Sequence, residues 1–304
     1  MGLPIRYTLA QGPVLAALGR VALSGLRKER PVQSPTVPGP WIEARLPPRR
    51  EEIVRAYIRH VGGDPAWYRG RLPAHLFPQW GFPLGARALE GLGYPLVRVM
   101  NGGCRIENRA PLPMGEDLVV RARIESIDDD GKRAVITQRI ITGTASTPDA
   151  TIADLRAFIP LGSKKEGSAK GGAPKARPTV PANAHEIAFL RIRDDAGLDF
   201  AKVTGDFNPI HWLAPYARAS GFRSVILHGF STLARAIEAL NRSRFAGDPR
   251  KLAVIDARFS RPLVLPARVG VYVTQDGGIW VGDAPGGGAY LEGRFEANTQ
   301  KTER

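Results

Sequence analysis

The sequence has almost no cysteine, and this narrows the chemistry open to it. Its 304 residues include one cysteine, Cys104, which excludes an internal disulfide and a cysteine-held zinc ion. A single cysteine suits a reducing compartment, so we expect a cytoplasmic protein. Cys104 follows Asn101-Gly102-Gly103 at the start of a strand-like run without a histidine beside it. This context favours a structural thiol over a nucleophile.

The chain also lacks a hydrophobic run of the roughly 20 residues that a membrane-spanning helix needs. Near the N-terminus, Leu15, Leu18 and Val21 repeat at helical spacing, and Arg20 interrupts the apolar run. This spacing predicts an amphipathic surface helix or strap rather than a signal peptide. We assign residues 1–40 to an N-terminal extension and expect no membrane span.

Nucleic-acid-binding motifs and Gly-rich phosphate fingerprints of the Rossmann or P-loop type are missing as well. The net charge is +14, but basic and acidic residues are interleaved along the chain, and no aromatic–basic stripe is present. We therefore expect no nucleic-acid partner and no nucleotide-dependent chemistry. The positive charge would not repel a phosphorylated ligand such as coenzyme A.

Residues 163–183 contain few large apolar side chains and an excess of basic ones. Such a segment cannot bury enough surface to offset the entropy lost on ordering, so we predict a flexible basic linker. It separates an N-terminal half, residues 41–162, from a C-terminal half, residues 184–304.

The two halves resemble each other. Residues 80–92 and 228–240 are identical at seven of thirteen positions with a constant offset of 148. The identical pairs are Gly81/Gly229, Phe82/Phe230, Ala86/Ala234, Arg87/Arg235, Ala88/Ala236, Glu90/Glu238 and Leu92/Leu240. Further on, residues 109–112 match residues 260–263 in the same order. This pattern indicates an internal duplication.

Each half combines one helical pattern with several strand patterns. Apolar residues at helical spacing follow Gly229, and a similar helix is expected after Gly81. Strand-like runs are found at residues 96–107, 118–124, 134–141 and 152–159 in the first half, and at residues 252–259, 269–273 and onward to about 295 in the second. One helix with several antiparallel strands, used twice, predicts an α+β fold.

The segment Gly205-Asp206-Phe207-Asn208-Pro209-Ile210-His211 has the composition of a tight loop. Such a loop can place Asp206 and His211, five residues apart, on the same side. A carboxylate and an imidazole that face one small space form an acid/base pair. The alternative is a surface turn in which Asp206 only caps its own backbone.

A second segment, Ile226-Leu227-His228-Gly229, leads into the predicted helix of the C-terminal half. The amide of Gly229 is then one of the unpaired donors of the first helical turn, and it could stabilise negative charge on a thioester oxygen. For His228, a role in the site and a purely structural role are both open.

Together these segments, with Tyr216-Ala217 and Gly221-Phe222 between them, resemble the MaoC-like dehydratases of the (R)-specific enoyl-CoA hydratase family. The resemblance implies a hot-dog fold, in which an antiparallel sheet wraps around a central helix, and two tandem repeats imply a double hot-dog. It also implies that Asp206 and His211 are the catalytic pair and that Gly229 is the oxyanion donor. We place Asn208, His228 and Phe230 in the substrate-binding part of the site.

The sequence departs from the family pattern at several positions. Leu213 stands where the family often has an acidic or polar residue, and Trp80 stands in the first repeat where the second has His228. Gly63-Asp64-Pro65 echoes Gly205-Asp206, but no histidine follows at the required distance. We therefore expect a degenerate first repeat that shapes the pocket for a bulkier acyl chain, and one active site per chain. His75 is expected to be a packed loop histidine, with pocket lining as the alternative.

The expected reaction is reversible hydration of a trans-2-enoyl thioester to the (3R)-3-hydroxyacyl thioester, without a metal or redox cofactor. The thioester would be carried by coenzyme A or by an acyl carrier protein, and a homodimer is left open. Two alternatives remain: a hot-dog acyl-CoA thioesterase, and a non-catalytic subunit that binds acyl thioesters.

Overall fold

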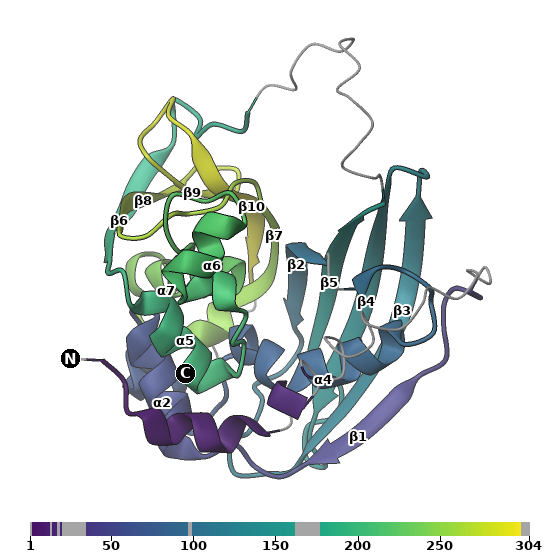
Figure 1. The fold of residues 1–304 in the computed structure, drawn as a ribbon. Helices are drawn as coiled ribbons and strands as arrows, with labels where there is room; N and C mark the ends of the chain where they lie inside the picture. The colour runs from purple at the N-terminus through teal and green to yellow at the C-terminus, as the bar shows by residue number, and fades with distance from the viewer. Residues whose placement is uncertain are drawn as a thin grey trace.

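The computed structural model describes residues 2–12, 14–16, 19, 35–96, 99–161 and 177–298. The predictions that involve Leu18, Val21 and most of the linker fall outside these residues. Within them, ten antiparallel strands form one sheet in the order β1-β3-β4-β5-β2-β7-β10-β9-β8-β6 (Figure 1). No helix among the described residues is long and apolar enough to cross a membrane.

The N-terminal unit supplies the first five strands and one long helix. Its elements, after the short helix η1 (Ile5–Gln11), are β1 (Ile42–Leu46), α2 (Glu51–His60), α3 (Pro65–Tyr68), η2 (Ala74–Leu76), α4 (Pro78–Leu89), β2 (Met100–Asn108), β3 (Leu118–Asp129), β4 (Arg133–Gly143) and β5 (Thr151–Pro160).

The C-terminal unit repeats this arrangement. Its elements are β6 (His185–Ile192), α5 (Ala196–Thr204), η4 (Pro209–His211), α6 (Ala214–Ala219), α7 (Gly229–Ser243), η5 (Pro249–Lys251), β7 (Leu252–Phe259), β8 (Ala267–Val273), β9 (Gly278–Gly282) and β10 (Ala289–Ala297). The strand order β1-β3-β4-β5-β2 of the first unit corresponds to β6-β8-β9-β10-β7 of the second. The chain therefore folds as two similar α+β units, each with a sheet curved around a helix.

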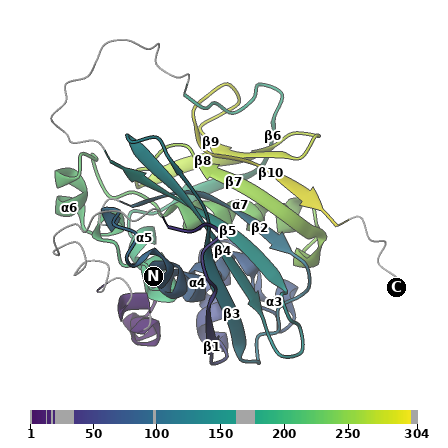
Figure 2. The ribbon, with the colours of Figure 1, turned by 90° about the vertical axis from the view of Figure 1, so that its right-hand side faces the viewer.

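The two units share one continuous sheet because β2 pairs with β7. The pairing is antiparallel and runs from Gly103 opposite Arg258 to Glu107 opposite Val254. Seen from the side, the sheet continues from one unit into the other without a break (Figure 2). Cys104 lies fully buried at this seam, where burial raises the pKa of its thiol, as a structural cysteine requires.

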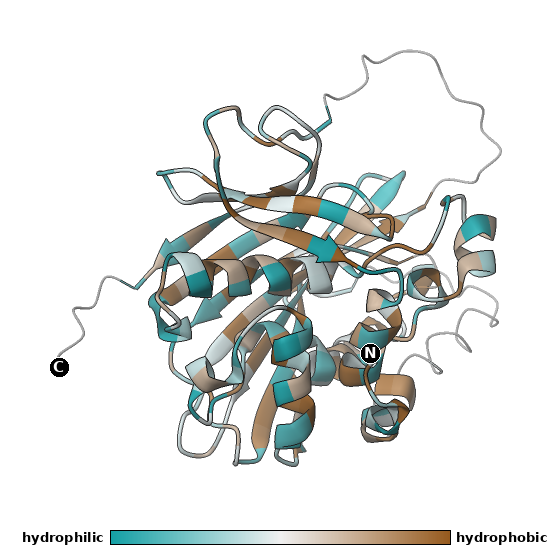
Figure 3. Ribbon diagram, turned by 90° about the vertical axis from the view of Figure 1, so that its left-hand side faces the viewer, coloured by the Kyte–Doolittle hydropathy of each residue, from teal (hydrophilic) through white to brown (hydrophobic). Residues whose placement is uncertain are grey.

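Alternating hydrophobicity explains why the strands form and which way they face. Along β3, buried Leu118, Val120 and Ala122 alternate with more exposed residues, which places one face of the strand in the core. Hydrophobic and hydrophilic residues alternate along strands and helices throughout the fold (Figure 3). The α7 helix carries a nearly continuous buried face that includes Leu233 and Ile237.

The two central helices sit differently on their sheets. The α7 helix packs against β6, β7, β9 and β10, whereas α4 packs mainly against β1 and β3 at the outer part of its sheet. Trp80 on α4 is buried, and its Nε1 donates a hydrogen bond of 2.9 Å to Thr142 Oγ1. The duplication is thus clear in topology but not symmetric in packing.

Several boundaries differ from the sequence-based expectation. The predicted strand at residues 96–107 begins at Met100, and the one at residues 118–124 continues to Asp129. The helix α2 and the strands β1 and β6 were not predicted. In α2, Ile53, Val54 and Tyr57 are buried at helical spacing, so a periodic signal was present.

Candidate active site

The Asp206 loop begins where α5 ends. Gly205 adopts a left-handed conformation, with φ of 86°, and its N–H donates to the carbonyl of Ala201 at 2.7 Å. This is the usual helix-ending geometry of glycine. A Cβ atom on Gly205 would lie 2.6 Å from the Cβ of Val14. The N-terminal segment therefore lies directly on the loop.

A short 3-10 turn then brings His211 back toward Asp206. The Asn208 side chain caps this turn, because its Oδ1 accepts a hydrogen bond of 3.3 Å from Ile210 N–H. The Asn208 N–H in turn donates to Asp206 Oδ1 at 3.4 Å. Asn208 is exposed, so in this structure it contacts the loop rather than the core.

His211 is held by its backbone and by its ring. A Cβ on Gly197 would lie 2.0 Å from the His211 carbonyl oxygen, which shows that α5 begins directly against this residue. The distance from His211 Nδ1 to the carbonyl oxygen of Ile226 is 2.9 Å. Since a carbonyl only accepts, Nδ1 carries the proton, and the neutral ring keeps the lone pair on Nε2.

His228 lies beneath His211. The two rings stack with centroids 3.6 Å apart and an interplanar angle of 27°. The His228 Nε2 donates to the backbone carbonyl of Asp206 at 2.9 Å and lies 3.9 Å from Asp206 Oδ2. Its ring also packs against Phe200, with centroids 4.8 Å apart. His228 therefore joins the start of α7 to the Asp206 loop.

Burial and mutual proximity set the protonation of this cluster. Burial raises the pKa of Asp206, and the nearby His211 opposes that shift. Burial also lowers the pKa of His211, which Asp206 partly offsets. The pKa of His228 falls well below its usual range, again because of burial first and His211 second. At neutral pH the two imidazoles are neutral, and Asp206 has an increased affinity for a proton, as a proton-transfer pair requires.

The start of α7 supplies a backbone donor beside this pair. The N–H groups of Ser231 and Thr232 donate to the His228 carbonyl at 3.0 and 3.1 Å, so the N–H of Gly229 lies ahead of the first intrahelical bond. A Cβ on Gly229 would lie 2.5 Å from the Phe259 ring. Glycine is thus required here by the packing of β7 against the helix start.

The structure brings Asp206, His211 and His228 together, with one side-chain ligand atom of each lying within 4.8 Å of the others. This donor set could be considered for a metal ion. However, the rings of His211 and His228 are stacked, and the lone pair of an imidazole lies in the plane of its ring. The two lone pairs therefore lie in nearly parallel planes and do not converge on one point. The arrangement suits proton transfer better than chelation.

Two other residues singled out from the sequence, Phe230 and Asp64, make packing or capping contacts. Phe230 is 3% exposed and packs against the rings of Phe77, Phe82 and Phe259, so it is placed in the core. Asp64, the echo of Asp206, caps α3 by accepting from Ala66 N–H at 2.9 Å.

Phe200, Phe259 and Val14 border the site but were not predicted. The apolar spacing of α5 only weakly indicated that Phe200 would be buried near the site. No local pattern indicated Val14 or Phe259, because only the tertiary fold brings them to the loop and to Gly229.

Comparison with known proteins agrees with this geometry. The family model described as MaoC like domain matches residues 167–284. The chain is 28% identical over 203 residues to a 3-hydroxyacyl-thioester dehydratase X of Mycobacterium tuberculosis, covering 66% of this chain and 68% of the relative. It is 29% identical over 190 residues to the enoyl-CoA hydratase ChsH3 of the same organism, covering 62% and 64%. The peroxisomal enoyl-CoA hydratase 2 of Arabidopsis thaliana is 28% identical over 183 residues, covering 56% of this chain and 58% of the relative.

Solved structures share the fold. The crystal structure of HtdX of Mycobacterium tuberculosis superimposes with a TM-score of 0.66 at 22% identity, covering 85% of this chain and 100% of that one. A MaoC-like dehydratase from Phytophthora capsici gives a TM-score of 0.65 at 18% identity, covering 87% and 97%. The C-terminal half of the chain is thus similar to MaoC-like dehydratase domains, and the whole chain has a double hot-dog fold.

Proposed function

We propose that this protein catalyses the reversible hydration of trans-2-enoyl thioesters to (3R)-3-hydroxyacyl thioesters. The observation that carries the proposal is the pairing of Asp206 with a neutral His211 whose Nε2 is unprotonated, next to the helix-start amide of Gly229. The matching relatives named as hydratases and dehydratases support the same reaction class. Acyl-CoA is the proposed substrate, with acyl carrier protein as the alternative carrier.

In the hydration direction, Asp206 and His211 hold a water molecule against the enoyl double bond. As the water oxygen bonds to the β-carbon, the pair takes up one proton, and the electron pair of the double bond shifts toward the thioester oxygen. The Gly229 N–H stabilises the enolate-like oxygen. The pair then returns one proton to the α-carbon, so that the product contains all the atoms of one water. Because the two groups are coupled, they act as a unit.

The test is to replace each member of the pair with an uncharged residue of similar shape. Asp206→Asn and His211→Asn should each lower kcat for hydration of crotonyl-CoA by about 10²–10⁴-fold, the usual contribution of general acid–base catalysis. His185→Gln, an exposed histidine on β6, is the matched control and should retain full activity. Circular dichroism checks the fold of each variant. Near-normal activity of a folded Asp206→Asn variant would overturn the proposal.

The same assay separates the two alternative activities. A thioesterase would release free coenzyme A, which a thiol reagent detects, whereas hydration leaves the thioester intact. A non-catalytic binding subunit would bind crotonyl-CoA and neither consume the double bond nor release thiol. Chiral analysis of the 3-hydroxybutyryl product tests the (3R) assignment.

A further inference from the structure

A second cavity lies between the two units, away from the proposed active site. It has a volume of about 370 Å³ and is lined, among others, by Tyr68, His75, Asn108, Ile237, Asn241 and Leu252. None of Asp206, His211, His228 and Gly229 lines it. We call it the interunit cavity. Its volume falls within the range of about 300–1,000 Å³ that is typical of small-molecule sites.

The duplication relates the interunit cavity to the active site. Residues 109–112, which follow β2, line the cavity. Their counterparts after β7, residues 260–263, border the catalytic segment, where Leu227 N–H donates to the Leu263 carbonyl at 2.8 Å. The cavity also borders Tyr68 and His75, which follow the Asp64 turn that echoes the Asp206 loop. It therefore occupies, in the N-terminal unit, the place that the active site occupies in the C-terminal unit.

One wall of the interunit cavity is a buried polar cluster. His75 Nε2 lies 3.1 Å from Glu238 Oε1, and Tyr68 donates its hydroxyl to the same oxygen at 2.6 Å. Asn241 Nδ2 donates to Glu238 Oε2 at 3.1 Å. All four residues are at most 5% exposed. His75 is therefore a packed histidine that also lines the interunit cavity.

Two amide oxygens at this cavity lack partners. The hydrogen bonds of Asn241 Nδ2 fix the orientation of its amide, and Asn241 Oδ1 has no partner among the residues that the structure describes. Asn108 Nδ2 donates to the Leu252 carbonyl at 2.8 Å, and Asn108 Oδ1 is likewise unpaired within the described chain. Buried acceptors without donors are unfavourable. Both residues line the cavity, but the two oxygens themselves have almost no accessible area, so a ligand with N–H groups would satisfy them only after a shift of the lining.

The remaining lining supplies apolar contact and positive charge. Ile106, Ile237 and Ile255 contribute buried apolar walls. The basic side chains that line the cavity are Arg71, Arg109, Arg250 and Lys251, against the single acidic residue Asp248. Arg250 pairs with Asp248, and Arg109 pairs with Glu107. Arg71 and Lys251 form no ion pair with any residue in the described ranges.

We propose that the interunit cavity is a second, non-catalytic site for a phosphopantetheine thioester. The phosphates would meet Arg71 and Lys251, and the acyl chain would contact the apolar wall. The pantetheine arm would pass Asn108 and Asn241, whose amide oxygens accept its N–H groups after a shift of the lining. The ligand class rests on the proposed function, because a duplicated thioester site accounts for this combination. The cavity has no counterpart of the Asp206–His211 loop, since Asp64 caps a helix there. The carboxyl group of Glu238 is taken up by hydrogen bonds to His75, Tyr68 and Asn241, so bound thioester is held without turnover.

The test measures how many ligands one chain binds. The probe is S-decyl-coenzyme A, a thioether that can be neither hydrated nor hydrolysed, titrated by calorimetry. We expect two molecules per chain for the unaltered protein. The double variant Arg71→Glu/Lys251→Glu should weaken one of the two sites by about tenfold or more, and Asn241→Leu should do the same from inside the cavity. The surface variant Arg45→Glu/Lys132→Glu carries an equal charge change away from the cavity and should bind two.

Activity measurements keep this proposal separate from the proposed function. The Arg71→Glu/Lys251→Glu variant should hydrate crotonyl-CoA at the unaltered rate, because neither residue belongs to the Asp206 site. One ligand per chain in the unaltered protein, or two that are insensitive to both cavity variants, would overturn the second site while hydration persists. Equal binding of decanoate would overturn the assignment to a phosphopantetheine ligand. Two cavity-sensitive ligands without any hydration would instead refute the proposed function alone.

Discussion

At the scale of single residues, burial controls the histidines around the site. His211 and His228 are neutral because they are buried beside each other. His60, at the end of α2, has its pKa lowered to about 4 by burial and by the nearby Arg235. Arg235 Nη2 lies 3.4 Å from His60 Nε2, so this ring accepts a hydrogen bond that protonation would remove.

The lowered pKa values of these histidines lead us to expect that the free energy of unfolding falls as the pH falls. When the pKa of a histidine is lower in the folded state than in the unfolded chain, the unfolded chain binds the proton at a higher pH. The stabilisation from the neutral His60 ring is therefore complete above pH 6.5 and is lost as the pH falls toward about 4. For partly buried His60 we expect a loss on the order of 1–3 kcal/mol in the free energy of unfolding. Urea titrations between these pH values measure it. His60→Gln should flatten the slope, and a stability independent of pH in this window would contradict the prediction.

Gly229 gives a second prediction at this scale. In Gly229→Ala the new methyl group would meet the Phe259 ring at 2.5 Å, so the helix start or the ring must move. We expect a loss of about 1–3 kcal/mol in stability and at least a tenfold fall in kcat, since the proposed oxyanion donor moves with the helix. Steady-state kinetics and urea unfolding measure the two effects. Gly115→Ala, at a position where a Cβ meets no atom within 4 Å, is the control and should change neither quantity.

The local sequence indicated the Asp206 loop and the start of α7, which the structure brings together, but not the residues around them. The Gly205–His211 segment is contiguous, so its turn chemistry is visible in the sequence. Phe200 and Phe259 are brought to the histidine pair and to Gly229 by the packing of α5 and β7. Such contacts depend on the complete fold, which is why no local pattern indicated them.

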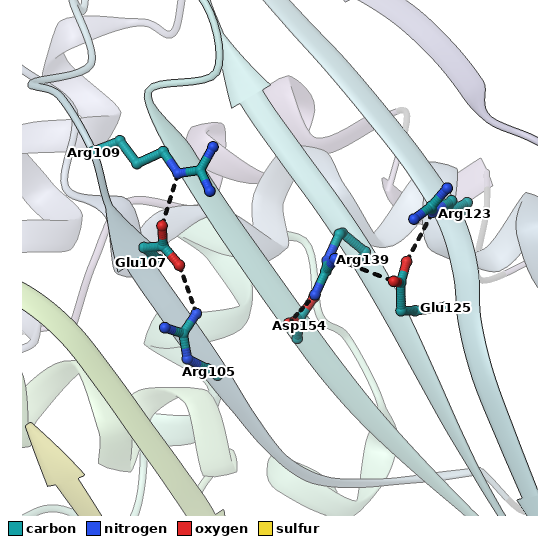
Figure 4. Close-up of polar contacts among 7 residues, drawn as sticks. All are labelled: Arg105, Glu107, Arg109, Arg123, Glu125, Arg139 and Asp154. Carbon is teal, nitrogen blue, oxygen red and sulfur yellow. Dashed lines mark hydrogen bonds and ion pairs between the residues drawn. The ribbon is translucent and has the colours of Figure 1, made fainter. Parts of the chain in front are cut away.

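At the scale of elements, the outer face of the N-terminal sheet is held by ion pairs across strands. Arg139 on β4 pairs with Asp154 on β5 through two bonds of 2.8 Å, and with Glu125 on β3 at 3.1 Å (Figure 4). A separate group on and beside β2 joins Arg105 and Arg109 to Glu107. These pairs cover the face of the sheet opposite the core.

The Arg139 network should contribute modestly and depend on salt. Arg139→Met removes both pairs, and we expect a loss of about 0.5–1 kcal/mol at low ionic strength that shrinks at about 0.5 M NaCl. Urea unfolding at the two salt concentrations tests this. Arg294→Met breaks an ion pair whose two side chains are 68% and 65% exposed and should have almost no effect. An Arg139→Met loss that is unchanged by salt would point to lost packing instead.

Strand and helix types were largely predictable, and their positions on the sheet were not. Period-two alternation identified β3, β4 and β5, and the spacing after Gly229 identified α7. The outward position of α4 on its sheet could not be predicted, although its sequence closely matches that of α7. Pro83 lies inside α4, and Trp80, which aligns with His228 in the sequence, lies within α4, whereas His228 precedes α7.

At the scale of the whole molecule, the pairing of β2 with β7 makes the units interdependent. A separate C-terminal unit would expose β7 as an unpaired edge and would leave Glu238 without Tyr68 and His75. A buried carboxyl group that loses its hydrogen-bond partners lowers the stability of the fold.

We therefore expect residues 162–304 expressed alone to aggregate. Co-expression with residues 1–161 as a separate chain should restore a one-to-one complex with hydratase activity. Size-exclusion chromatography and the crotonyl-CoA assay provide the measurement. A monomeric, active C-terminal unit would contradict the interdependence.

The two units that pair through β2 and β7 belong to one chain, and this has a consequence for how their sequences could diverge. In a dimer of identical chains, every substitution occurs in both subunits. A change that adapts one site to binding alone therefore also impairs catalysis at the other site. In this chain Trp80 stands in the first half at the position that aligns with His228 of the second. Because the two halves have separate sequences within one chain, a substitution in one half leaves the other unchanged.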